Sequence, residues 1–174
     1  MTDQAALLAS LSDRLAIGDL LARYCRGIDR CDAEELRRVF TADARLDFGA
    51  GPQRRDGAID QLLAGLRAMR LTHHSIAQSL VEIEGVRARA ETYVTAFHLV
   101  GMPGQWTEMV VGGRYLDTFA RVGEGWQITE RLYVMDWNRQ GPASMQESGG
   151  LYDTLRRQGA RWPDDPSCAW QHEG

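Results

Sequence analysis

The sequence predicts an α+β fold in which helices come first and a meander of long antiparallel strands follows. Over the first 70 residues, apolar side chains recur every three or four positions, and beyond them the period changes to two. Glycine-containing turns separate the later segments, as they do in β-hairpins. This order is typical of helices segregated to one face of an antiparallel sheet.

The predicted first helix spans residues 4–30 and the second follows almost at once. Asp32 is expected to be the N-cap of this second helix, with Glu35 three residues later completing a capping box. The two helices should therefore form a tight hairpin. The apolar stripe of the first helix consists of Ile17, Leu20, Leu21, Tyr24 and Ile28.

A short strand is predicted at 44–48, and Asp56 is expected to cap a third helix that carries apolar residues from Ile59 to Met69. The sheet itself should come from the later part of the chain. Its predicted strands cover 73–83, 86–100, 107–122 and 126–137. Gly112 and Gly113 fall inside one of them and indicate a bulge or bend.

The C-terminal part, from residue 138 onward, has a different character. A helix is expected within 149–159, followed by an irregular tail. Trp162 and Trp170 are unusual in a solvated tail, so we expect them to dock on the body of the protein or on a neighbouring subunit.

Composition narrows the class of protein. The chain has 174 residues, 44% of them hydrophobic, and a formal charge of −4, which favours one globular domain and argues against a general nucleic-acid-binding role. No apolar run approaches the ~20 residues of a membrane-spanning helix, and the first residues lack a secretion signal. With only three cysteines, these observations predict a cytoplasmic protein without a disulfide framework.

Several reaction classes lack the residues that they require. All 20 basic residues are arginine, which excludes Schiff-base aldolases, pyridoxal phosphate enzymes and the Walker phosphate loop. There is no Gly-x-Ser-x-Gly elbow, no glycine-rich phosphate loop and no His-x-x-x-His pair. We therefore expect no metal and no cofactor.

An acid–base site is the chemistry that remains. Asp29 follows Tyr24 by five residues, which is ~140° around a helix, so it stays near the core face only if the helix ends there. Spacing alone favours a surface or capping acid over a site residue. His73 and His74 are adjacent in a predicted strand, so only one of them can face a pocket. His98 and His172 are interpreted as structural.

A resemblance to a known family rests on several segments within residues 8–140. They are Ile17–Tyr24, Gly27–Asp32, Val39–Ala44, Thr72–Gln78, Gly113–Phe119 and Gly125–Ile128. In these the chain resembles SnoaL-like members of the nuclear-transport-factor-2-like superfamily. The resemblance implies a cone-shaped barrel with three N-terminal helices packed in the concave face of a strongly curved, mostly antiparallel sheet. It implies a single domain over 1–174, with 141–174 as a C-terminal extension.

The resemblance also implies a site. Members that are dehydratases or dehydrochlorinases use an Asp–His dyad, which corresponds to Asp29 and His74, with Tyr24 as a further catalytic residue. His74 is preferred to His73 because the family histidine lies four residues before an Asn, here replaced by Gln78. The expected substrate-binding residues are Arg131, Tyr133, Trp106, Met109 and His73.

The implied activity is that of a cofactor-independent lyase. It would eliminate water, halide or formaldehyde from a hydrophobic, aromatic or polycyclic small molecule by Asp–His acid–base catalysis. An isomerase or cyclase using the same dyad is one alternative, and a non-catalytic small subunit of a ring-hydroxylating dioxygenase is another. The expected partners are the small-molecule substrate and further copies of the chain in a dimer or trimer, with neither nucleic acid nor membrane.

Overall fold

The computed structural model describes residues 2–146, 148–155 and 157–170. Its helices are α1 (Thr2–Arg30), α2 (Ala33–Val39), α3 (Arg55–Arg67) and α4 (Pro166–Trp170), with a 3-10 helix, η1, at Gly150–Thr154. Its strands are β1 (Phe40–Asp47), β2 (Gln53–Arg54), β3 (Leu71–Glu84), β4 (Arg87–Met102), β5 (Gln105–Val122) and β6 (Gly125–Pro142). Helices precede the long strands, as the sequence predicts.

The six strands form one sheet in the order β2-β1-β6-β5-β4-β3. Strand β1 runs parallel to β6, and the other neighbouring pairs are antiparallel. Within the described residues, the edge strands β2 and β3 do not pair with each other, so the sheet is open. The α+β class and the mostly antiparallel sheet are confirmed, without closure into a complete barrel.

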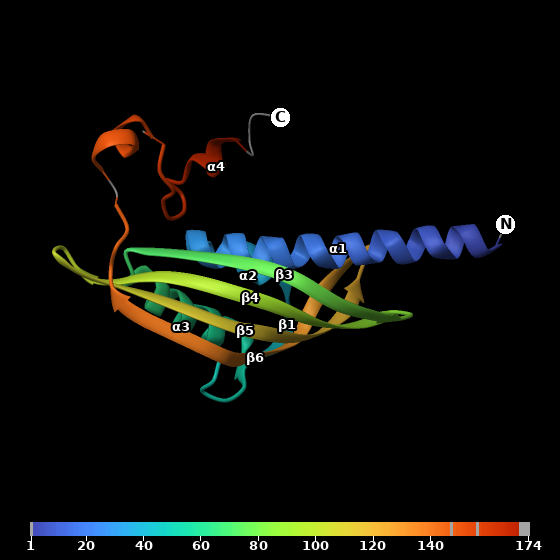
Figure 1. The fold of residues 1–174 in the computed structure, drawn as a ribbon. Helices are drawn as coiled ribbons and strands as arrows, with labels where there is room; N and C mark the ends of the chain where they lie inside the picture. The colour runs from blue at the N-terminus through green and yellow to red at the C-terminus, as the bar shows by residue number, and fades with distance from the viewer. Residues whose placement is uncertain (1, 147, 156, 171–174) are drawn as a thin grey trace.

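Helices α1, α2 and α3 bury their apolar faces in one core together with the sheet. Ile17 of α1, Leu36 of α2 and Phe119 of β5 are completely buried in that core. All five residues of the predicted α1 stripe are at most 9% exposed, and each such burial stabilises the fold by roughly 1.5–3 kcal/mol. Figure 1 shows α1 lying along the strands, with its N-terminal end reaching beyond them.

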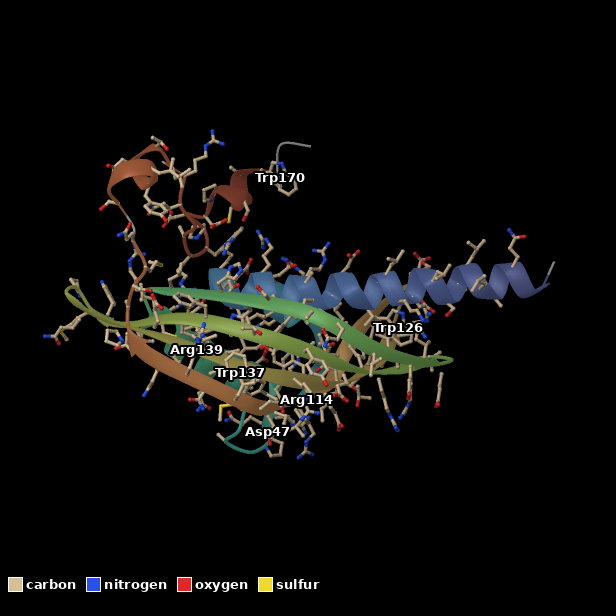
Figure 2. The ribbon with its side chains drawn as sticks, in the orientation of Figure 1. Asp47, Arg114, Trp126, Trp137, Arg139 and Trp170 are labelled. Carbon is tan, nitrogen blue, oxygen red and sulfur yellow. The ribbon has the colours of Figure 1, made fainter. Side chains whose placement is uncertain are left out.

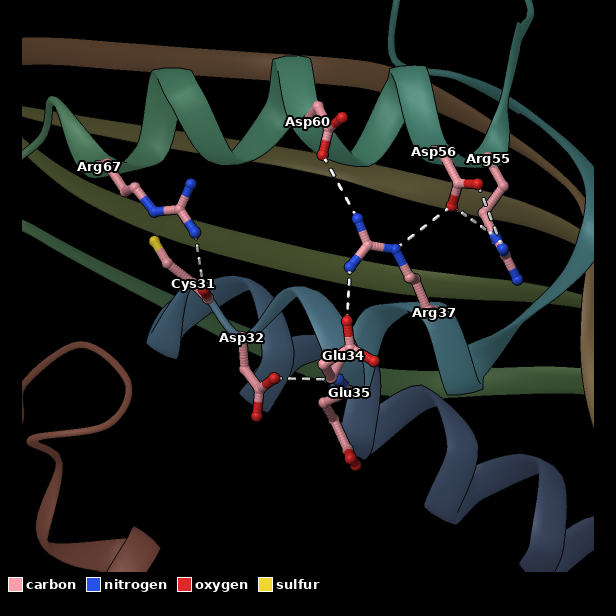
Figure 3. A network of polar contacts seen from close by, with 9 residues as sticks. All are labelled: Cys31, Asp32, Glu34, Glu35, Arg37, Arg55, Asp56, Asp60 and Arg67. Carbon is pink, nitrogen blue, oxygen red and sulfur yellow. Dashed lines mark hydrogen bonds and ion pairs between the residues drawn. The ribbon is translucent and has the colours of Figure 1, made fainter.

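Asp32 is the N-cap of α2, as predicted, because its carboxylate accepts the Glu35 N–H at 3.0 Å (Figure 3). The reciprocal half of the capping box is absent from the described contacts. The Glu35 carboxylate instead binds Arg23 at 3.2 Å and Arg38 at 3.0 Å. The cap therefore depends on Asp32 alone.

The prediction that Asp56 caps α3 is wrong. The helix begins at Arg55, and its N-cap, Arg54, makes no capping bond through its side chain. Asp56 lies in the first turn, where it pairs with Arg55 at 2.9 Å and with Arg37 of α2 at 3.4 Å (Figure 3). A carboxylate in the first turn still favours the helix electrostatically, and here it also ties α3 to α2.

The C-terminal segment differs from the prediction in two respects. The helix expected within 149–159 is reduced to the single 3-10 turn of η1. Trp170 is 75% exposed, and Figure 2 shows it on α4, away from the sheet, so it does not dock on the body of the protein. Docking of Trp170 on a neighbouring subunit stays a prediction. Trp162 is 43% exposed, although its backbone N–H donates to the Arg30 carbonyl at 2.6 Å.

Strand β3 carries a bulge between Ile76 and Ser79, where its pairing with β4 shifts by one residue. After the bulge, Val81 and Ile83 pack against the core, whereas before it Ile76 does. An extra residue reverses the alternation of side chains between the two faces of a strand. The bulge therefore decides which of the two neighbouring histidines faces the helices.

The predicted irregularity at Gly112 and Gly113 is confirmed, because the pairing of β5 with β6 shifts between them. A Cβ atom at Gly112 would lie 2.2 Å from the indole of Trp137, so that indole covers the glycine closely. Trp137 is thereby held on the sheet (Figure 2).

Among the described residues, no helix is long and apolar enough to cross a bilayer.

Candidate active site

Helix α1 ends in a Schellman motif that leaves Asp29 in its last turn. The Cys31 backbone adopts a left-handed φ of 53°, and its N–H donates to the Ile28 carbonyl at 3.2 Å. The Asp32 N–H donates to the Gly27 carbonyl at 2.8 Å, which is the second bond of this motif. The sequence places Asp29 near the core face only if the helix ends there, and the helix does end there. Asp29 is accordingly buried.

Asp29 binds His74 through both carboxylate oxygens. Its Oδ1 lies 2.7 Å from the imidazole Nδ1, and its Oδ2 accepts the His74 backbone N–H at 2.8 Å. The two side chains are only 7% and 8% exposed. An ionised carboxylate can only accept, so Nδ1 carries the proton and Nε2 is the basic nitrogen of the ring.

His73 points the other way. It is exposed and pairs with Phe97 of β4, whereas His74 pairs with the buried Ala96. Because neighbouring side chains of a strand alternate between its faces, only His74 lies on the face that the helices cover. The structure brings Asp29 and His74 together and leaves His73 outside.

A second histidine adjoins the pair. The rings of His98 and His74 meet edge to face, with centroids 5.4 Å apart. His98 is 7% exposed, and its Nδ1 has no hydrogen-bond partner within the described chain. Burial, followed by the nearby His74, lowers the pKa of His98 to about 4, so the ring is neutral near pH 7. The sequence-based interpretation of His98 as structural did not predict its contact with His74.

His98 also lines a cavity of about 310 Å³ between α3 and the sheet. Most of its wall is apolar, and none of the described residues that form it carries a charged side chain. Asp29 and His74 do not line the cavity. His98 contacts His74 with its ring and also lines the cavity, so it lies between the pair and this space. The other lining residues are Leu46, Phe48, Ala50, Gln53, Ala58, Gln61, Leu62, Gly65, Leu66 and Met69.

Arg131 belongs to a second buried cluster. Its Nε and Nη2 bind the two oxygens of Asp117 at 2.7 and 2.6 Å, and both side chains are 0% exposed. The guanidinium lies over the rings of both Tyr24 and Tyr115, 3.9 and 4.0 Å from their centroids. Burial alone would lower the pKa of Arg131, but the attraction of Asp117 outweighs it and raises this pKa.

Tyr24 therefore faces Arg131 in the structure. Burial raises the pKa of Tyr24 to about 12, so the hydroxyl keeps its proton. Arg131 Nη1 has no hydrogen-bond partner within the described chain, which leaves one buried donor available.

The remaining predicted residues are dispersed. Tyr133 is half-buried beside Tyr115, and its hydroxyl is buried without a partner in the described chain. Met109 pairs with His98 across β4 and β5. Trp106 lies three residues earlier on β5 and so falls on the opposite alternation. None of these three lines the cavity.

The described residues contain no group of three His, Cys, Asp or Glu side chains suited to hold a metal ion. The thiols of Cys25 and Cys31 are poor nucleophiles, because burial raises the pKa of Cys25 to about 12 and also raises that of Cys31. The base that the arrangement provides is thus the imidazole Nε2 of His74.

Residues 9–132 match the SnoaL-like domain family. Uncharacterized proteins of Mycobacterium tuberculosis and Mycobacterium bovis are 33% identical over 129 residues, which is 72% of this chain and 86% of theirs. Most of the relatives' length is therefore shared.

Solved structures show the same fold. A protein of Kribbella flavida has a TM-score of 0.69 at 26% identity and covers 75% of this chain and 95% of its own. A provisionally named scytalone dehydratase of Novosphingobium aromaticivorans has a TM-score of 0.69 at 22% identity, with 80% and 91% covered. A hexachlorocyclohexane dehydrochlorinase has a TM-score of 0.69 at 19% identity, with 82% and 97% covered. The last two support the fold alone.

Proposed function

The chain belongs to the SnoaL-like domain family, and we propose that it is a cofactor-independent lyase acting on a neutral, hydrophobic small molecule. The observation that supports this most is the bidentate contact of Asp29 with His74, which leaves Nε2 as a base. The ring of His74 meets that of His98, which lines a cavity. The uncharged, mostly apolar wall favours a neutral aromatic or polycyclic substrate over an anion or cation.

In the proposed reaction, His74 Nε2 removes a proton from a carbon or an oxygen of the substrate. The released electron pair forms a double bond, and the bond to the leaving group breaks. Asp29 stabilises the imidazolium that forms, without itself becoming protonated. The proton then leaves with the departing hydroxide or halide, or returns to carbon if formaldehyde is lost, so the imidazole is neutral again.

Negative charge that develops on the substrate needs hydrogen-bond donors. We propose that His98, which is neutral, buried and part of the cavity wall, contacts the substrate there. Arg131 is a proposed donor through its unpaired Nη1, from the neighbouring buried cluster and not from the wall of this cavity. Tyr24 supports it by stacking on the guanidinium. Tyr133 is a further candidate, since its buried hydroxyl lacks a partner among the described residues.

The experiment screens neutral hydroxylated and halogenated aromatic and polycyclic compounds, without added cofactor, for loss of water, hydrogen halide or formaldehyde by mass spectrometry. Replacing His74 by Ala should lower turnover by ~10²–10⁴-fold, because the general base is gone. Asp29→Asn should also be costly, and the two losses should not add because they disable one device.

The matched control is His73→Ala, which removes an exposed histidine on the opposite face and should leave turnover intact. Equal activity of the His74 variant and the wild type would contradict the proposal. A product of unchanged mass would instead identify an isomerase that returns the proton to another carbon. Co-purification with an iron–sulfur protein, without turnover, would favour a non-catalytic small subunit.

A further inference from the structure

The C-terminal segment of residues 159–168 lies outside the family match and folds back onto the end of α1 that carries Asp29. The Trp162 N–H donates to the Arg30 carbonyl at 2.6 Å, and Arg30 Nε lies 2.9 Å from the Asp165 carboxylate. That carboxylate in turn accepts the Ala160 N–H at 2.9 Å. Figure 1 shows the segment next to the C-terminal end of α1.

The guanidinium of Arg161 joins three elements at this place. Its Nη1 donates to the backbone carbonyl of Asp29 at 2.5 Å and to Thr72 Oγ1 at 2.8 Å. Its Nη2 donates to the carbonyls of Leu66 at 2.9 Å and Met69 at 3.4 Å. These acceptors belong to the end of α1, the start of β3 and the end of α3.

Both helix ends favour a cation with several donors. The last carbonyls of a helix lack partners within the helix and carry partial negative charge. A guanidinium satisfies several of them at once because its N–H groups form a rigid planar fork, whereas a lysine ammonium presents a single point of charge. Arg161 reaches the ends of α1 and α3 with one side chain.

We propose that Arg161 is a positioning residue for the Asp29–His74 pair, an inference that rests on the proposed function. Arg161 binds the backbone carbonyl of Asp29, and His74 binds its carboxylate. Thr72 lies on the strand two residues before His74, on the same face. Leu66 and Met69 are cavity residues, so the same guanidinium also sets the cavity wall relative to the pair.

The test uses a readout that needs no substrate. A proton in a short imidazole–carboxylate hydrogen bond gives a far-downfield proton NMR signal, which the His74→Ala and Asp29→Asn variants assign by its loss. In Arg161→Gln, solvent exchange of this proton should be at least about tenfold faster, because the end of α1 opens more often. Adding millimolar methylguanidinium to Arg161→Ala should restore the slow exchange, whereas ammonium should not.

The matched control is Arg67→Gln. Arg67 also donates to a carbonyl at this end of α1, that of Cys31 at 3.3 Å, but it does not contact Asp29 (Figure 3). The control should leave the exchange rate unchanged. Thermal melts of both variants separate a local effect from a general loss of stability.

Three results would overturn the inference. The first is an exchange rate in Arg161→Gln equal to that of the wild type. The second is an equal acceleration in both variants, in proportion to their loss of melting temperature. The third is the absence of the downfield signal in the wild type. If the signal responds as expected but no compound is turned over, the positioning role stands and the proposed function fails. With a substrate, Arg161→Gln should lower kcat more than it raises KM.

Discussion

Replacing Asp117 by Asn should strongly destabilise the protein. The change keeps the shape of the side chain but leaves Arg131 without its counter-charge at a position that is 0% exposed. One of the two oxygens that Arg131 binds at 2.6 and 2.7 Å becomes an NH2 group, which faces the guanidinium as a donor. Removing one partner of a buried ion pair costs about 3–5 kcal/mol. For a chain of this size, each kcal/mol lowers the melting temperature by roughly 2–4 °C, so we expect a fall of about 6–20 °C.

The assay is urea unfolding followed by circular dichroism, with Asp136→Asn as the matched control. Asp136 pairs with Arg114 at 2.9 Å across the same two strands, but these side chains are 35% and 29% exposed (Figure 2). Such a surface pair contributes about 0–1 kcal/mol. An Asp117→Asn variant no less stable than the Asp136→Asn control would refute the reasoning.

A double variant tests whether the loss of stability comes from the unpaired charge of Arg131. Arg131→Met combined with Asp117→Leu removes both charges and replaces them with apolar side chains. Buried ion pairs exchanged in this way are often neutral or even stabilising, so the double variant should be more stable than Asp117→Asn. The double variant would still lose the stacking of Arg131 on Tyr24 and Tyr115. This loss reduces the stability that the double variant recovers.

Two further predictions concern the tail and the assembly. Although burial opposes it, hydrogen bonds from Ala160 and Ser167 and the charge of Arg30 lower the pKa of Asp165 from 3.8 to about 2. Its contribution to docking of the tail should be complete above about pH 4 and fade towards pH 2, visible as a change in tryptophan fluorescence. On the outer sheet face, Trp137 is 48% exposed, so light scattering should find a homo-oligomer; a monomer at micromolar concentration would contradict this.

The helices and their limits follow from local sequence. The α1 stripe and the Asp32 cap are confirmed because each depends on side chains within a few residues of one another. The Asp29–His74 contact was expected from the resemblance rather than from spacing, since it joins residues 45 apart in the chain. Local patterns are informative where the interacting groups are neighbours in sequence.

The bulges explain what alternation could not predict. Counting back from the hairpin pair Glu84–Arg87 would place His74 opposite Phe97, but the bulge in β3 places it opposite Ala96 and brings His98 onto the same face. In the same way, a bulge between β5 and β6 pairs Asp117 with Arg131. A single extra residue changes these partners, and sequence alone does not reveal where the extra residue is.

Arg161 was missed for a different reason. It lies 132 residues from Asp29, in a segment without periodic structure. Its acceptors are mostly backbone carbonyls, which leave no mark on the identity of the residues that provide them. A contact of this kind becomes visible only once the chain is folded.

Strand β6 continues to Pro142, ten residues beyond the end of the family match at residue 132. A chain shortened to the matched residues would end in the middle of that strand. The part of β5 from Tyr115 back to Thr107 would lose its neighbour, because its partners in β6 are Tyr133 to Pro142. Unpaired strand edges recruit other chains, so such a fragment should aggregate. It would also lack the tail that carries Arg161, so the matched residues alone do not contain every contact made to Asp29.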